Sequence, residues 1–114
     1  MESKTPRSKS IALESGHFPD AAGLERATET LRLLANGERL KILCHLSLEG
    51  EMSVGQLLER ATLSQSALSQ HLAKFRKAGV LSTRKEHQTV YYSIGNDDVL
   101  KVLRLMQDLY CASP

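Results

Sequence analysis

The apolar residues of this chain follow helical spacing over most of its length and change to a strand pattern late in the sequence. In residues 20–34, Leu24, Leu31 and Leu34 recur on one face of a helix. Residues 89–94, TVYYSI, are instead rich in the β-branched and aromatic side chains typical of a strand. The pattern predicts a mainly α fold with a small β ribbon. Its predicted helices cover residues 20–34, 37–48, 53–61, 64–79 and 98–110, and its predicted strands cover 80–84 and 89–94, with a short strand at 52–53.

Two of the predicted helices are separated by Thr62 and Leu63 alone. Each helix follows a serine, Ser53 or Ser64, which is a good N-cap because its hydroxyl accepts a hydrogen bond from an unpaired backbone N–H. Gly79 ends the second helix, as a left-handed C-cap does. So tight a joint between two capped helices is typical of a helix-turn-helix.

The second of these helices has an apolar stripe and an opposite polar face. Short and amide-bearing side chains on that face suit DNA base edges and phosphates. The candidate DNA-binding residues on this helix are Gln65, Ser66, Ser69, Gln70 and Lys74, with Ser64 at the N-cap. Five basic residues and no acid lie between positions 74 and 85: Lys74, Arg76, Lys77, Arg84 and Lys85. This excess is the electrostatic pattern expected for contact with phosphates, although an ordinary amphipathic helix and hairpin with a solvated polar face is the simpler alternative.

Composition supports one soluble domain. The chain has 114 residues, 41% hydrophobic and 25% charged, with a net charge of +2 that is too small to identify a partner. No apolar run approaches the roughly 20 residues of a membrane span, and the first residues lack an apolar signal core. We therefore expect a cytoplasmic protein whose cysteines are normally reduced. Residues 1–19 predict a flexible arm, and residues 20–114 a DNA-binding and dimerisation domain.

Several short motifs resemble the arsenic-repressor (ArsR) family of winged-helix repressors over about residues 22–111. They are Leu34-Ala35-Asn36 with Arg39-Leu40-Ile42-Leu43, Leu63-Ser64-Gln65-Ser66, Leu68-Ser69-Gln70-His71-Leu72, Ala78-Gly79-Val80-Leu81 and Val90-Tyr91-Tyr92. The resemblance implies a winged helix-turn-helix in the order α-α-(β)-α-α-β-β-α that binds double-stranded operator DNA. Apolar stripes on the first and last helices predict a homodimer through both, and so a palindromic site. The resemblance adds His71 to the major-groove residues and implies backbone or minor-groove contacts from a wing with Arg84, Lys85 and Gln88.

The two cysteines resemble those of the sulfur-responsive BigR and SqrR repressors within that family. The signatures are Ile42-Leu43-Cys44, Gln88-Thr89-Val90-Tyr91-Tyr92 and Leu109-Tyr110-Cys111. This resemblance implies a redox-sensing repressor that releases DNA when Cys44 and Cys111 become linked through disulfide or polysulfide. Persulfides would be the effector and sulfide-detoxification genes the targets. On the residues alone, Cys44 is equally well a small buried hydrophobe and Cys111 a thiol near a fraying end.

The charges near each cysteine predict an order of reaction. Lys41 lies one helical turn before Cys44 and favours its thiolate, whereas Asp108 and the helix C-terminus disfavour the thiolate of Cys111. We therefore expect Cys44 to react first and Cys111 to resolve the intermediate.

Other functions have weaker support. A metal- or metalloid-responsive repressor is the main alternative, but it needs a third ligand beside Cys44 and Cys111. An enzyme is not expected, because the chain has no phosphate loop, no CxxC and no catalytic triad pattern. A DNA-binding protein without any effector is the third alternative. The sequence predicts neither a cofactor nor a resident metal.

Overall fold

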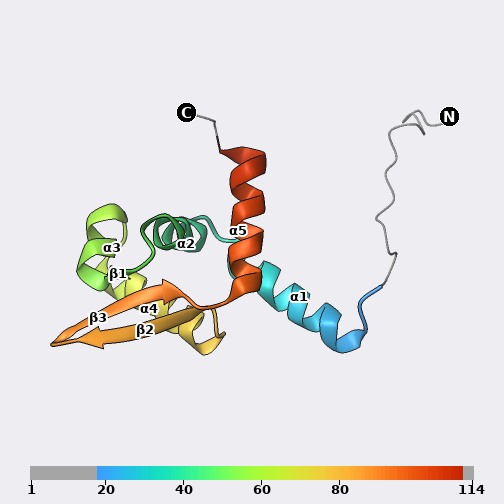
Figure 1. The fold of residues 1–114 in the computed structure, drawn as a ribbon, viewed down its shortest axis with the longest axis horizontal. Coiled ribbons are helices and arrows are strands. Elements are labelled where there is room, and N and C mark those ends of the chain that lie inside the picture. Colours follow the sequence, from blue (N-terminus) through green and yellow to red (C-terminus); the bar gives the residue numbers. More distant parts are fainter. Residues whose placement is uncertain (1–17, 112–114) are drawn as a thin grey trace.

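The computed structural model describes residues 18–111, which form five helices and a small antiparallel sheet (Figure 1). The order of elements is the predicted one. It runs α1 (Ala21–Leu34), α2 (Gly37–Glu49), β1 (Met52–Ser53), α3 (Val54–Arg60), α4 (Gln65–Lys77), β2 (Leu81–Glu86), β3 (Thr89–Ile94) and α5 (Asp97–Tyr110). The predicted winged helix-turn-helix fold is therefore confirmed. Of the predicted arm, residues 1–17 lie outside the described residues, so this part of the domain division stays a prediction.

Every helix starts at a capping residue, and two of these are the serines that the sequence predicted. The Ser53 hydroxyl accepts from the backbone N–H of Gln56, and the Gln56 side chain accepts from the N–H of Ser53, which completes a capping box. The other four caps also accept a hydrogen bond from the backbone three residues later; they are Asp20, Asn36, Ser64 and Asn96. These local bonds fix the helix boundaries independently of the rest of the fold.

Helix α2 lies at the centre of the core, as its broad apolar surface predicts. One completely buried residue is Leu43 of α2, and two more are Leu68 and Phe75 of α4. Helix α4 is therefore held against the body by its apolar stripe. Fully burying such a side chain stabilises the fold by about 1.5–3 kcal/mol. The remaining buried core residues are Leu34, Ile42, Leu46, Met52, Leu57, Leu72, Val80, Leu81, Val99 and Leu103.

The sheet has the strand order β1-β3-β2, with all pairs antiparallel. Strand β2 starts one residue later than predicted and runs two residues further, because pairing continues to Glu86 opposite Thr89. Only His87 and Gln88 form the turn, and His87 has a φ of 58°, in the left-handed region. At the other end of the ribbon, Gly95 passes so close to Ser82 that an added Cβ would lie 2.0 Å from its hydroxyl oxygen.

Three parts of the molecule extend from its body in different directions. The β2–β3 wing and α1 extend from opposite sides of the body, and α5 rises away from both (Figure 1). None of the helices within residues 18–111 has the length and apolar character needed to cross a membrane.

Candidate functional site: a DNA-reading face and a dithiol hollow

Helix α4 presents a continuous exposed face opposite its buried stripe. Gln65, Ser66, Ser69, Gln70 and Lys74 are all exposed, as expected for residues that contact DNA. Because α3 and α4 are both anchored in the core through Leu57 and Leu68, this face is held rigidly. The arrangement matches a recognition helix that inserts its N-terminal half into a major groove.

The structure adds detail on Ser64 and His71, and it adds Lys77 to the candidate DNA-binding residues. The hydroxyl of Ser64 accepts from the N–H of Ala67 at 3.1 Å, so its first role is structural. His71 is half-buried, and helical geometry places it about 100° from Gln70, towards the core. Lys77 was not among the predicted site residues, although it is exposed and lies nearly in line with Ser66 and Gln70. The sequence did contain a signal for Lys77 as a DNA-binding residue. Lys77 follows Gln70 by seven residues, which places it on the same helix face, and it belongs to the basic cluster.

The wing residues Lys85 and Gln88 are exposed, but Arg84 has its charge engaged within the protein. Its guanidinium donates from Nε to Glu51 at 3.2 Å and from a terminal nitrogen to Glu86 at 2.8 Å. It also lies 4.8 Å from the centroid of the Tyr91 ring, in cation–π geometry. The hydrogen bond from Arg84 lowers the pKa of Glu51, and the two carboxylates raise the pKa of Arg84. Arg84 can therefore reach phosphate only after leaving these partners.

Both cysteines line one hollow of about 470 Å³ between α2 and α5, which we call the thiol hollow. Cys44 comes from α2, and Cys111 is the C-cap of α5, where its N–H donates to the carbonyl of Gln107 at 3.0 Å. Both thiols are free. The rest of the lining is mostly apolar and consists of Leu40, Ser47, Leu48, Leu100, Leu103, Arg104, Met106, Gln107 and Tyr110.

The expected activation of Cys44 is wrong. Burial, and then the charge of Cys111, raise the pKa of the Cys44 thiol, so its thiolate is disfavoured. Lys41 is not among the groups that shift this pKa, and its ammonium lies 4.0 Å from the Glu38 carboxylate. Cys111 can act on Cys44 because both residues line the same hollow, which no spacing in the sequence could establish.

Several large apolar side chains are left exposed on α1 and α5. Leu24 and Leu31 of α1 are 47% and 59% exposed, and Leu105 and Leu109 of α5 are 52% and 60% exposed. At 100° per residue, Leu105 and Leu109 lie on the opposite side of α5 from Leu103, Gln107 and Cys111. One face of α5 therefore lines the thiol hollow while the other is an unpaired apolar surface.

Metal ligands are not gathered in the described part of the chain. Within residues 18–111, no group of three or more His, Cys, Asp or Glu side chains is placed to hold an ion.

Comparison with known proteins agrees with this geometry. The arsR family of bacterial regulatory proteins matches residues 31–83. The chain is 50% identical over 86 residues to the transcriptional activator HlyU of Vibrio cholerae, covering 75% of this chain and 79% of HlyU. A solved structure of reduced HlyU has a TM-score of 0.75 and 47% identity, covering 80% of this chain and 95% of that one.

Two further relatives extend the comparison. The biofilm growth-associated repressor of Agrobacterium fabrum is 35% identical over 115 residues, covering 98% of this chain and 96% of that protein. A homodimeric winged helix-turn-helix DNA-binding domain from Mycobacterium bovis has a TM-score of 0.70 and 28% identity, covering 85% of this chain and 89% of that one. HlyU and the Agrobacterium fabrum protein are transcriptional regulators and not enzymes, as the sequence predicted for this chain. The chain belongs to the ArsR family of bacterial helix-turn-helix transcriptional regulators.

Proposed function

We propose that this regulator is a dimeric dithiol sensor that represses transcription while reduced. The reduced protein binds a palindromic operator, and a covalent link between Cys44 and Cys111 releases it, so that sulfide-detoxification genes are expressed. The observation that carries this proposal is the placement of both free thiols in one hollow between α2 and α5. The repressor from Agrobacterium fabrum supports the repressor role, and the structure of reduced HlyU, a transcriptional activator, supports only the relevance of a reduced state.

The proposed chemistry uses an organic persulfide, R–S–SH, as the oxidant. Cys111 attacks first, because burial disfavours the Cys44 thiolate. The Cys111 thiol takes the outer sulfur, which gives Cys111–S–SH and releases R–SH. Cys44 then attacks the Cys111 sulfur, which forms the Cys44–Cys111 disulfide and releases H₂S. If both thiols are persulfidated, their reaction forms a trisulfide and also releases H₂S. The two cysteines thus lose two electrons to sulfane sulfur.

A homodimer is part of the proposal. The exposed leucines of α1 and α5 would bury one another across a two-fold axis, as expected of apolar faces left without partners. The homodimeric relative from Mycobacterium bovis supports this arrangement. A two-fold dimer places two copies of α4 about 34 Å apart, facing successive major grooves.

The position of α5 explains how the link would reach the DNA. A bond between Cys44 and Cys111 ties the end of α5 to α2, and α2 packs in the core against the recognition helix. The opposite face of α5 would carry the dimer contact, so a shift of α5 changes the spacing of the two recognition helices. Coupling of about 1–3 kcal/mol weakens DNA binding about 5- to 150-fold.

The test is DNA binding by fluorescence anisotropy, using a duplex that the reduced protein enriches from a random library. Treatment with a persulfide donor should weaken binding by the wild type about 5- to 150-fold, which corresponds to a coupling of about 1–3 kcal/mol. The Cys44→Ser and Cys111→Ser proteins should keep their affinity, and mass spectrometry should find a cross-linked peptide only in the wild type. Equal loss of affinity in all three proteins would refute dithiol sensing.

The same assay distinguishes the metal-sensing alternative. Loss of DNA binding at stoichiometric zinc or arsenite, without any change in thiol mass, would favour a metal or metalloid effector. The described residues offer no third ligand to Cys44 and Cys111, which is why we rank redox sensing first.

A further inference from the structure

A second hollow, of about 500 Å³, lies at the corner where α1 ends, α2 begins and α4 ends. We call it the basic hollow, because four cationic side chains and one acid line it. The cations are Arg32, Arg39, Lys74 and Lys77, the acid is Glu29, and the remaining lining is Leu33, Ala35, Asn36 and Ala78. Arg32 and Arg39 come from the consecutive helices α1 and α2, whereas the two lysines come from α4, more than 30 residues later, so the fold brings the two pairs together.

Few negative charges offset the four cations of the basic hollow. In the described part of the chain none of the four forms an ion pair. Arg39 donates from one terminal nitrogen to the carbonyl of Leu33 at 3.1 Å, while its Nε is buried without a partner. The N-terminus of α2, a helix of 13 residues, adds a partial positive charge beside Asn36. The potential here therefore favours an anion.

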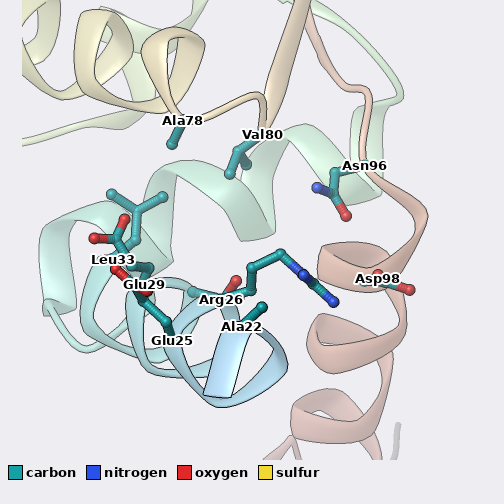
Figure 2. Close-up of a pocket in the computed structure, with 10 residues that line it drawn as sticks. Ala22, Glu25, Arg26, Glu29, Leu33, Ala78, Val80, Asn96 and Asp98 are labelled. Carbon is teal, nitrogen blue, oxygen red and sulfur yellow. The ribbon is translucent and has the colours of Figure 1, made fainter. Parts of the chain in front are cut away.

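The positive charge is confined to one side of Leu33. A neighbouring hollow of about 620 Å³ shares Glu29, Leu33 and Ala78 with the basic hollow, but its charged lining consists of three acids and one arginine. Figure 2 shows this neighbour, with Arg26 extending from α1 towards Asn96, the N-cap of α5, and Asp98. Since adjacent hollows carry opposite charge, the basic hollow is a local feature and not the result of a generally basic surface.

The basic hollow continues the DNA-reading face of α4. Lys77 lies nearly in line with Ser66 and Gln70, and seven residues of helix place it about 10 Å beyond Gln70. The major groove is about 12 Å wide, so a helix with Gln70 among the bases brings Lys77 to the sugar-phosphate backbone at the groove wall. The neighbour of Lys77 in the hollow, Arg32, then faces the same backbone.

We propose that the basic hollow binds a backbone phosphate of the DNA, through Lys77, Arg32 and Arg39. The inference relies on DNA binding through α4, which is part of the proposed function. It extends the DNA contact beyond the helix-turn-helix and wing to the corner between α1 and α2. Because phosphate contacts carry no base information, this site sets affinity and register and leaves sequence preference unchanged.

The test compares the salt dependence of DNA binding in the full-length Arg32→Gln and Lys77→Gln proteins with that of the wild type. The probe is a fluorescein-labelled duplex of mixed sequence, titrated at several NaCl concentrations. Each substitution acts in both subunits of the dimer, so the loss of one phosphate contact per subunit should reduce the slope of log Kobs against log[NaCl] by about 1.8, or about 0.9 per subunit. Arg26→Gln is the matched control, because it removes the same charge from the same helix but lines the acidic neighbour. Its slope should equal that of the wild type.

The outcomes separate this inference from the DNA-binding role itself. Wild-type slopes in both Arg32→Gln and Lys77→Gln would overturn it, as would an equal reduction in Arg26→Gln, which would indicate bulk charge alone. Variants that keep the wild-type slope but lose a thermal shift with ATP would assign the hollow to a free nucleotide and also overturn it. A wild-type protein that binds no duplex would refute DNA binding and the inference together. Thermal unfolding by circular dichroism checks that each variant is folded.

Discussion

The exposed face of α5 offers a quantitative test of dimerisation. Leu105 and Leu109 lie one turn apart and are 52% and 60% exposed in the single chain. Burying a whole leucine side chain is worth about 1.5–3 kcal/mol, so burying the exposed half of each contributes about 0.8–1.7 kcal/mol per leucine. With two leucines in each of two subunits, the Leu105→Gln/Leu109→Gln protein should lose about 3–7 kcal/mol of dimer stability. Glutamine is a good helix former, so α5 itself should persist.

This loss is large enough to measure by sedimentation equilibrium. At 1.4 kcal/mol for each factor of ten, the dimer dissociation constant should rise about 10²- to 10⁵-fold. Leu48→Gln is the matched control, because Leu48 is a leucine that is 71% exposed on α2, away from this face of α5. It should dimerise like the wild type.

The reasoning would be refuted if the double variant dimerised as tightly as Leu48→Gln. Circular dichroism would first establish that both proteins keep their helices. Loss of dimer in both variants would instead indicate that exposed leucines act through general association and not through α5.

Three further predictions concern single residues. Iodoacetamide labelling over a pH series should show that the pKa of the Cys44 thiol lies above its ordinary value, and Cys111→Ser should lower that pKa only partly, since burial is the larger cause. An unchanged pKa in Cys111→Ser would contradict this. Glu51→Gln should free Arg84 for phosphate and increase the salt slope of DNA binding by about 0.9 for each phosphate that Arg84 then binds; an unchanged slope would show that Arg84 stays away from DNA. Because the folded-state pKa of Glu51 is lowered, its bond to Arg84 is present at neutral pH and is lost as the pH falls through that lowered value. Leu68→Ala should reduce the free energy of unfolding in urea by about 2–5 kcal/mol, since Leu68 is fully buried, and a loss below about 1 kcal/mol would contradict the core assignment.

The sequence by itself determined the elements and their order. Capping residues such as Ser53 and Ser64 act on backbone groups three residues away, so their effect is readable locally. The apolar stripe of α4 likewise follows from helical spacing alone, and it correctly left Gln65 and Gln70 exposed. Family motifs then supplied the winged helix-turn-helix topology.

The tertiary structure decided the electrostatics of the site. Arg84 meets Glu51 across 33 positions of sequence, and this pairing removes a cation that the local charge pattern offered to DNA. The pKa of Cys44 moved opposite to the expectation from Lys41, because partial desolvation of this exposed thiol, and then the nearby Cys111, raise it. Hydrogen bonds within a helix depend on the next few residues, whereas desolvation and ion pairing depend on whichever segments the fold brings together. For that reason the sequence could name the two thiols, and only the packing of α2 against α5 could place them in one hollow.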